Sequence, residues 1–397
     1  MLLNTERLHA RMSKLRLDAI VATSPENVTY MSGFWALPQW IRRGPQAYVV
    51  WTARGDGEPE IITSTATLDL IADQDIWVER VRRYGTFHVD QSVETGTDPV
   101  CRRQMELQAQ PDHGDALTAL VASLRDAGLT RARIGIDEVG LMPDQLTELR
   151  QRLPDATLLT AANVFRDVRA VKTEEEIARL ARVAEITERS IDAALAVARV
   201  GASELDRARA FQTQTVQEDA LPVLGCIGFG ERSALMNVQP SRRTLEQGDV
   251  IRFDVGGRYR HYRADIARIA IFGEPTREIR QKHRALLAGV ERACELIRPG
   301  KRVADIYAAA VETVRREGIP HYRRNHVGHG IGLDGYDAPA LTQTSDERLE
   351  AGMVLCVETP YYEAGRWGLQ VEDMIVVRAD GAERLTATSG DLMLVTP

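Results

Sequence analysis

The sequence contains little cysteine. Among its 397 residues there are four, which lie far apart and form no C-x-x-C pair: Cys101, Cys226, Cys294 and Cys356. A disulfide framework needs several cysteines at short spacings, and a structural zinc site normally takes thiolates from such pairs. We therefore expect neither feature. The low cysteine content is typical of a protein of the reducing cytoplasm, and this is the location that we expect.

The sequence also lacks long apolar runs and an excess of positive charge. Nowhere do the ~18 consecutive apolar residues that a membrane-spanning helix requires occur, and the N-terminal residues do not resemble a signal peptide. The formal net charge is −7, from 50 Lys and Arg against 57 Asp and Glu. Nucleic-acid-binding proteins usually carry a basic surface instead. The sequence thus predicts no membrane and no nucleic acid as a partner.

The length of the chain favours two domains. In the first third, short apolar runs at 18–23 and 48–52 have the character of buried strands. An amphipathic pattern at 115–128 predicts a helix that ends at Gly128, and another apolar run follows it. Because strands and helices alternate, residues 1–165 are predicted to form an α/β domain.

From residue 173 the pattern changes. Thr173 followed by Glu176 is a capping box, which predicts the start of a long helix that can reach Gly201. Further helices are predicted at 203–217, 276–297 and 303–317, among strands that contain glycine. We assign residues 166–397 to a second domain.

Two aspartates stand near the ends of the segment "DVGGRYRHYRAD" in this second domain. Asp254 and Asp265 are separated by what reads as a turn between two strands, so they are expected to face each other. Facing residues of an antiparallel pair have Cβ atoms about 5 Å apart. Two carboxylates at that distance repel each other, and one stays protonated unless a cation lies between them.

A second carboxylate pair follows the same logic. Glu358 and Glu372 lie on two strands that we expect to be joined through "AGRWG", so they can also meet across a hairpin. Between the two pairs lies "GHGIG", in which glycines flank His329 and permit a close approach of backbone and ligand.

The candidate ligands are thus two aspartates, two glutamates and one histidine. A single divalent ion does not need four carboxylates from separate elements, whereas two ions about 3.5–4 Å apart do, with one aspartate and one glutamate bridging them. Such oxygen-rich ligation with one imidazole suits Mn²⁺, with Fe²⁺, Co²⁺ or Zn²⁺ as alternatives. Two such ions activate a shared water and polarise a carbonyl group, which predicts the hydrolysis of an amide.

The order of these residues resembles the pita-bread metallopeptidases, a family that includes prolidase, Xaa-Pro aminopeptidase, methionine aminopeptidase and the metal-free creatinase. Each motif has its counterpart: "FDVGG" with Asp254, "DIAR" with Asp265, "GHGIG" with His329, "VET" with Glu358 and "VED" with Glu372. The segment "ENVTYMSGF" (26–34) is similar to the N-terminal domain of creatinase. The resemblance implies an α/β creatinase-like N-terminal domain, an α+β pita-bread C-terminal domain, and a homodimer.

Three positions depart from the family pattern. Asn237 and Tyr336 occupy positions at which the resemblance implies histidines that hold the substrate, and Gln370 occupies the position of an arginine. Asn and Tyr can also donate hydrogen bonds to an oxyanion. His326, three residues before His329, is a candidate for a replacement imidazole or for a structural histidine.

The hypothesis that follows is a dinuclear metallohydrolase that resembles Xaa-Pro dipeptidase and acts on small peptides. By resemblance, Glu358 also carries a proton to the leaving nitrogen, while Asn237, His326 and Tyr336 contact the substrate, and His326 and Tyr336 assist catalysis. Two alternatives stay open at this point. One is a metal-dependent hydrolase or lyase that cleaves a C–N or C–S bond of a small non-peptide molecule. The other is a non-catalytic binding module.

Overall fold

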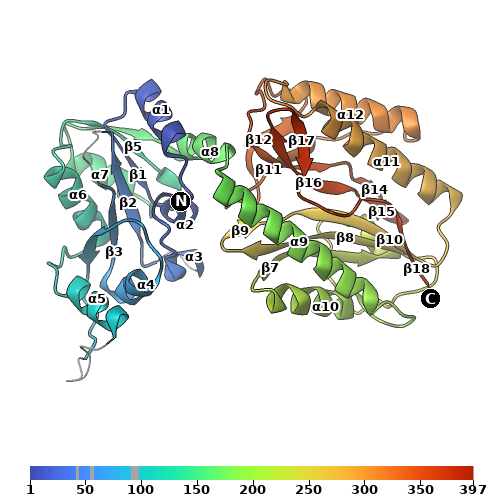
Figure 1. Cartoon of the computed structure of the whole chain (residues 1–397), viewed down its shortest axis with the longest axis horizontal. Helices are drawn as coiled ribbons and strands as arrows, with labels where there is room; N and C mark the ends of the chain where they lie inside the picture. Colours follow the sequence, from blue (N-terminus) through green and yellow to red (C-terminus); the bar gives the residue numbers. More distant parts are fainter. Residues whose placement is uncertain (42–43, 54–57, 91–97, 397) are drawn as a thin grey trace. The chain divides into compact units, whose positions relative to one another are not determined.

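The computed structural model describes residues 1–41, 44–53, 58–90 and 98–396. The chain divides into two compact units, Met1–Val168 and Arg169–Pro397 (Figure 1). Helix α8 (Ala162–Ala170) runs across this division. Each unit has its own hydrophobic core, so each is described by itself.

The N-terminal unit is built on a mixed sheet. Over the residues that the structure describes, six strands lie in the order β4-β3-β2-β1-β5-β6. These strands are β1 (Ala19–Ala22), β2 (Tyr48–Thr52), β3 (Glu60–Ser64), β4 (Arg80–Tyr84), β5 (Arg133–Ile136) and β6 (Thr157–Thr160). The helices are α1 (Thr5–Leu15), α2 (Pro25–Ser32), α3 (Leu37–Ile41), α4 (Leu68–Asp73), α5 (Pro99–Gln108), α6 (Ala116–Asp126) and α7 (Gln145–Arg152). The predicted α/β fold is confirmed.

The C-terminal unit contains one large curled sheet. Within residues 169–396 its main path runs β12-β11-β13-β16-β10-β8-β7, with β9, β17 and β18 paired to β8, β16 and β10. The strands are β7 (Leu221–Phe229), β8 (Val250–Tyr259), β9 (Tyr262–Arg263), β10 (Ile266–Phe272), β11 (His326–Gly330), β12 (Asp337–Thr342), β13 (Val354–Glu358), β16 (Glu372–Arg378), β17 (Gly381–Arg384) and β18 (Met393–Val395). A separate hairpin is formed by β14 (Tyr361–Glu363) and β15 (Trp367–Leu369).

Four long helices accompany this sheet: α9 (Glu174–Ala196), α10 (Glu204–Gln217), α11 (Arg277–Leu296) and α12 (Val303–Glu317). The predicted capping box is present, since the Thr173 hydroxyl accepts from the Glu176 backbone N–H while the Glu176 carboxylate accepts from the Thr173 N–H. All four helices lie where the sequence predicts them, with their ends shifted by a few residues.

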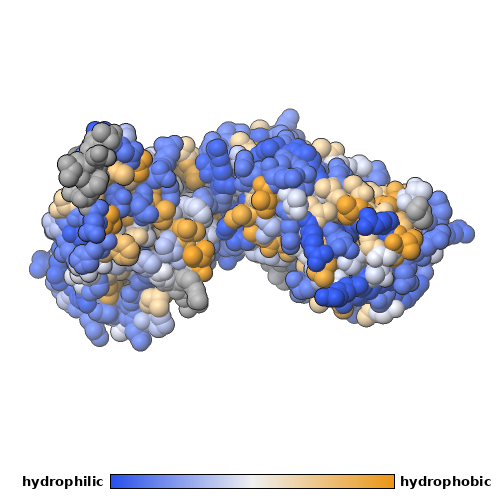
Figure 2. Space-filling view, turned by 90° about the horizontal axis from the view of Figure 1, so that it is seen from below, coloured by the Kyte–Doolittle hydropathy of each residue, from blue (hydrophilic) through white to orange (hydrophobic). Residues whose placement is uncertain are grey.

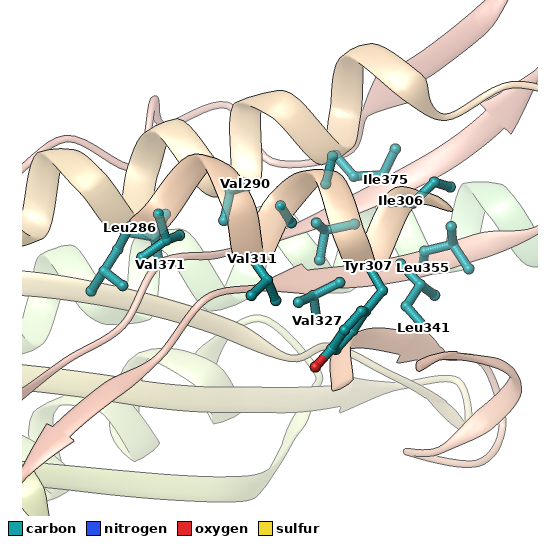
Figure 3. Packing of buried hydrophobic residues seen from close by; sticks show 14 of the residues in the cluster. Leu286, Val290, Ile306, Tyr307, Val311, Val327, Leu341, Leu355, Val371 and Ile375 are labelled. Carbon is teal, nitrogen blue, oxygen red and sulfur yellow. The ribbon is translucent and has the colours of Figure 1, made fainter. Parts of the chain in front are cut away.

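Helices α11 and α12 form a rigid backing for the strands beside them. Leu286 and Val290 of α11 and Val311 of α12 pack against Val327 of β11 and Leu355 of β13 (Figure 3). Burying each such side chain contributes about 1.5–3 kcal/mol. Because successive side chains of a strand point to opposite faces, the strands backed in this way present their other face to a different environment.

The polar surface is consistent with this burial. Figure 2 shows hydrophilic residues over most of the visible surface, with hydrophobic residues in scattered groups. No helix among the described residues is long and apolar enough to cross a membrane.

The register of β8 and β10 corrects one expectation. Asp254 does not pair directly with Asp265; its partner across the ladder is Ala267, and Asp265 precedes the first residue of β10. The reason is the position of the turn: Arg260 and His261, both with positive φ, connect the strands, so Tyr259 pairs with Tyr262 and the same register pairs Asp254 with Ala267. The two aspartates are therefore diagonal neighbours, a spacing that is still within reach of their side chains.

The connection between the strands of Glu358 and Glu372 corrects a second expectation. Glu358 and Glu372 are direct partners across β13 and β16, as expected. These strands are not joined by a simple turn, however, because the β14-β15 hairpin lies between them in the chain. The pairing survives because the hairpin forms its own small sheet and leaves the main ladder intact.

The chain just before Asp265 passes so close to β8 that position 256 has no room for a side chain. A Cβ atom at Gly256 would lie 1.8 Å from the Ala264 carbonyl oxygen, whereas at Gly225 on the neighbouring strand β7 it would meet nothing within 4 Å. We predict that Gly256→Ala destabilises the protein by about 1–3 kcal/mol through overpacking, while Gly225→Ala is tolerated. Denaturant unfolding of both variants measures this, and equal stabilities would contradict it.

Candidate metal centre

The predicted ligands converge from neighbouring strands. In residues 169–396 the sheet order β11-β13-β16-β10-β8 brings together His329 on β11, Glu358 at the end of β13, Glu372 at the start of β16, Asp265 just before β10, and Asp254 on β8. Each strand thus contributes one side chain at the same level of the sheet. Residues spread over more than a hundred positions of the sequence meet because of this strand order.

The ligand atoms are close enough to share cations. One carboxylate oxygen from each of Asp254, Asp265 and Glu372 lies within 4.8 Å of the others. The Nε2 atom of His329 lies 3.8 Å from Asp265 Oδ2 and 3.9 Å from Glu372 Oε1. These distances leave space for an ion between the donors but not for separate hydration of each group.

The imidazole of His329 is oriented as a ligand. Its Nδ1 lies 3.0 Å from the Gly330 carbonyl oxygen, which can only accept, so Nδ1 carries the proton. Burial lowers the pKa of His329 to about 4, so that the ring is neutral. Its Nε2 therefore presents a lone pair to carboxylate oxygens, an arrangement that repels unless a cation binds there.

The carboxyl groups show the same need for positive charge. Burial first, and then the charges of the neighbouring carboxylates, raise the pKa values of Asp265 and Glu372 well above their usual range. Burial also raises the pKa of Asp254, and it raises that of Glu358 to about 7. Asp265 Oδ1 and Glu372 Oε1 are buried and have no hydrogen-bond partner among the described residues. Divalent cations fit this donor set.

Gln370 lies inside the cluster rather than at its margin. Its Nε2 donates to Glu358 Oε2 at 3.3 Å and to Glu372 Oε2 at 3.2 Å. Its Oε1 accepts from Arg252 Nη1 at 2.9 Å and from the Tyr362 hydroxyl at 3.0 Å. From the sequence, Gln370 was noticed only as a departure from the family pattern, and Arg252 and Tyr362 were not noticed at all.

His326 and Tyr336 lie beside the cluster. The Nδ1 atom of His326 is 3.2 Å from Glu358 Oε1, and burial together with the nearby Arg324 lowers the pKa of His326. The Tyr336 ring stacks on that of His329 with centroids 4.0 Å apart, and 59% of Tyr336 is exposed. Both residues can therefore meet a substrate, and their roles in substrate binding stay predictions.

Asn237 is exposed in the segment that follows Met236. The carbonyl oxygens of Leu235 and Met236 accept hydrogen bonds from Arg252, so this segment borders the cluster. Contact of the Asn237 side chain with a substrate also stays a prediction.

Cys356 is a further residue that sequence reasoning did not connect with the site. It lies two positions before Glu358 on β13, and its sulfur lies within 4.8 Å of donor atoms of His329 and Glu372. Strand alternation places residues i and i+2 on one face and could have revealed it. Burial raises the pKa of the thiol well above its usual range, and the thiol donates to the Asp265 carbonyl oxygen at 3.7 Å. The donor set is therefore dominated by oxygen.

Two protein-family models match the chain. Metallopeptidase family M24 matches residues 178–379, and the creatinase/prolidase N-terminal domain matches residues 5–171. The matched ranges cover the two compact units, and they agree with the predicted creatinase-like and pita-bread folds.

Individual proteins are similar to the chain along most of its length. The Xaa-Pro dipeptidase of Pyrococcus furiosus is 30% identical over 235 residues, which are 58% of this chain and 67% of that protein. The crystal structure of X-Pro aminopeptidase from Thermotoga maritima has a TM-score of 0.78 at 24% identity, with 99% of each chain covered. An Xaa-Pro dipeptidase structure from Bacillus anthracis has a TM-score of 0.80 at 22% identity, with 98% of each chain covered. These two structural likenesses concern the fold.

The raised carboxyl pKa values predict how stability depends on pH. The folded-state pKa of Glu358, about 7, exceeds its usual value of 4.5. The folded metal-free protein therefore holds a proton that the unfolded chain has lost, and this contribution to stability disappears as the pH rises from about 4.5 through 7. Asp265 and Glu372 shift in the same direction. We predict that the melting temperature of chelator-treated protein falls between pH 5 and pH 8.

Bound cations should reverse this trend, because they favour the deprotonated carboxylates. The buried Glu176, whose pKa burial also raises to about 7, lies outside the cluster and affects both samples equally. The readout is therefore the difference between melting curves recorded with and without Mn²⁺. A difference that does not grow with pH would contradict the prediction.

Proposed function

We propose, since the chain belongs to metallopeptidase family M24, that it is a dinuclear metal-dependent dipeptidase that cleaves the bond before proline in short peptides. The observation that carries the proposal is the convergence of four carboxylates and a neutral imidazole from five neighbouring strands in residues 169–396, with buried oxygens that have no protein partner. The Xaa-Pro dipeptidase of P. furiosus, at 30% identity, supports this choice of substrate.

The ions would be held by Asp254, Asp265, His329, Glu358 and Glu372. Asp265 and Glu372 would lie at the centre of this ligand set, because both lie within 4 Å of His329 Nε2 and both belong to the oxygen cluster with Asp254. The predominance of carboxylate donors favours Mn²⁺, with Fe²⁺, Co²⁺ or Zn²⁺ as alternatives. When bound, two such ions supply an activated water and polarise the scissile carbonyl.

Glu358 is suited to move the proton. Its Oε1 lies beside His326 Nδ1 and 3.7 Å from Arg324 Nη2, while its Oε2 is held by Gln370. Placed in this way, the carboxylate could both accept a proton and pass it to the leaving nitrogen. His326, held neutral, and the exposed hydroxyl of Tyr336 would orient the substrate carbonyl by hydrogen bonds.

A proline substrate also constrains recognition. The nitrogen of an Xaa-Pro bond carries no hydrogen, so the site must recognise the shape of the ring rather than an N–H donor. On the family resemblance we further propose that the protein acts as a homodimer in the cytoplasm.

A second candidate keeps the metal centre and changes the substrate. The absence of histidine at Asn237 and Tyr336 favours it, since these residues replace two groups that the family resemblance assigns to the peptide carbonyl. The enzyme would then cleave a C–N or C–S bond of a small non-peptide molecule. A non-catalytic module is not favoured, because a fold that only binds has no need of four buried carboxylates that repel each other.

Elemental analysis and an activity panel test the proposal together. We predict about two Mn²⁺ ions per chain after reconstitution, and turnover of Xaa-Pro dipeptides that exceeds turnover of matched Xaa-Ala dipeptides. Two bound ions with no dipeptide cleaved, but with cleavage in a panel of small amides and thioethers, would favour the second candidate. A protein that binds no divalent ion contradicts both.

Removal of one ligand should separate chemistry from folding. We predict that Asp254→Ala lowers kcat/KM by at least about 100-fold, because the ligand set is incomplete. The relieved crowding of carboxylates should offset only part of the structural cost, because the buried Arg252 loses its carboxylate partner. Asp380→Ala, at an exposed position, is the control. Full turnover in the Asp254 variant would refute the assignment.

A further inference from the structure

Arg252 is a buried arginine at the edge of the metal centre. It lies two residues before Asp254 on β8, and its side chain is completely shielded from solvent. A buried guanidinium is costly unless its charge is paired and its N–H groups are satisfied. Its partners are therefore informative about its role.

All five N–H donors of Arg252 have acceptors. Nη1 donates to Asp254 Oδ2 at 3.0 Å and to Gln370 Oε1 at 2.9 Å. The remaining donors bond to three main-chain carbonyls, those of Ser233 at 2.8 Å, Leu235 at 2.6 Å and Met236 at 2.9 Å. A guanidinium has five N–H donors in a fixed planar arrangement, so the geometry around it is fully determined.

The bond to Asp254 connects Arg252 with the oxygen cluster. Oδ2 is bound by the guanidinium, and one oxygen of Asp254 lies within 4.8 Å of oxygens of Asp265 and Glu372. Asp265 and Glu372 differ, because each has a buried oxygen with no hydrogen-bond partner among the described residues. The Arg252 guanidinium thus neutralises Asp254 at one end of the carboxylate cluster.

The bond to Gln370 extends this influence to two more ligands. Because the Oε1 atom of Gln370 accepts from Arg252 and Tyr362, its Nε2 is turned toward the carboxylates of Glu358 and Glu372. The opposite orientation of the amide would direct its N–H groups at the Arg252 guanidinium, which can only donate, and its oxygen at two carboxylates. Arg252 therefore determines which end of Gln370 faces the cluster.

The structure assigns to Arg252 the role of a positioning residue that fixes Asp254 directly, and Glu358 and Glu372 through Gln370, for metal binding. The family resemblance implies an arginine at position 370, between β15 and β16, where this chain has Gln370; here a guanidinium from β8 contacts that residue instead. The same guanidinium holds the segment 233–236 against the site. The inference rests on the proposed dinuclear function.

The test is an exchange of the two side chains. Arg252→Gln should weaken the binding of Mn²⁺ by about 10–100-fold, as loss of a group that orients metal ligands typically does. The double variant Arg252→Gln/Gln370→Arg places a guanidinium beside Glu358, Glu372 and Asp254, the carboxylates with which Gln370 interacts in the wild type, and should recover Mn²⁺ affinity to within about threefold of the wild type. Its melting temperature should stay lowered, because the carbonyls of segment 233–236 lose their donor. Calorimetric titration with Mn²⁺ and thermal unfolding in chelator measure the two effects separately.

Arg207→Gln is the matched control. Arg207 on α10 is also fully buried, but its guanidinium has no hydrogen-bond acceptor among the described residues and lies 5.8 Å from the Phe229 ring. This variant should change the melting temperature and leave Mn²⁺ affinity unchanged. If Arg252→Gln does not fold, Arg252→Lys and the double variant decide, and the lysine variant should bind Mn²⁺ more weakly than the wild type because it has fewer donors.

The outcomes separate the two proposals. Wild-type protein that binds no divalent ion overturns the proposed function and this inference with it. Wild-type protein that binds two Mn²⁺ ions while a folded Arg252 variant binds them equally well overturns only the role of Arg252. Weakened binding that the double variant does not recover would show that Arg252 acts through packing alone, which also overturns the inference.

Discussion

Repulsion between buried carboxylates is the constraint on which the C-terminal unit depends. The sheet brings four carboxyl groups to one level: those of Asp254, Asp265, Glu358 and Glu372. Burial raises the pKa of all four, and the charges of neighbouring carboxylates raise those of Asp265 and Glu372 further. Left without cations, such a cluster protonates or separates. The strand pairing that holds it together must therefore draw its stability from elsewhere in the unit, and the cluster in turn has a strong affinity for divalent ions.

The hydrophobic backing supplies that stability. On β13, Leu355 and Val357 belong to the core beneath α11 and α12, while Cys356 and Glu358 alternate with them and face the cluster. A shift of one residue in this strand would bury Glu358 among the helices and expose two apolar side chains to the carboxylates. The register of β13 that places Glu358 among the ligands is thus the same register that places Leu355 and Val357 in the core. A change of register would disrupt both the site and the core.

The sequence could predict the composition of the site better than its geometry. Asp254, Asp265 and His329 could be proposed as ligands because their order and spacing, together with those of Glu358 and Glu372, form a combination that a chance arrangement would rarely give, although each motif alone is weak. The offset of Asp265 from direct pairing with Asp254 could not be predicted, since it depends on a two-residue turn at Arg260 and His261, where the sequence has neither the Asn nor the Gly that usually marks such a turn. Arg252 carried a usable signal, because residues two apart on a strand share a face. It was missed because only candidate ligands were sought.

The departures from the family pattern affect recognition more than proton transfer. Glu358 keeps its neighbour His326 and its contact with Gln370, so its carboxylate is still placed to accept and release a proton. Tyr336, by contrast, covers one face of the His329 ring with an aromatic surface and an exposed hydroxyl. If Tyr336 contacts the substrate, as we propose, its ring would offer a flat surface that suits the pyrrolidine of proline as well as other compact rings. Amide hydrolysis can therefore be retained while the set of accepted substrates changes.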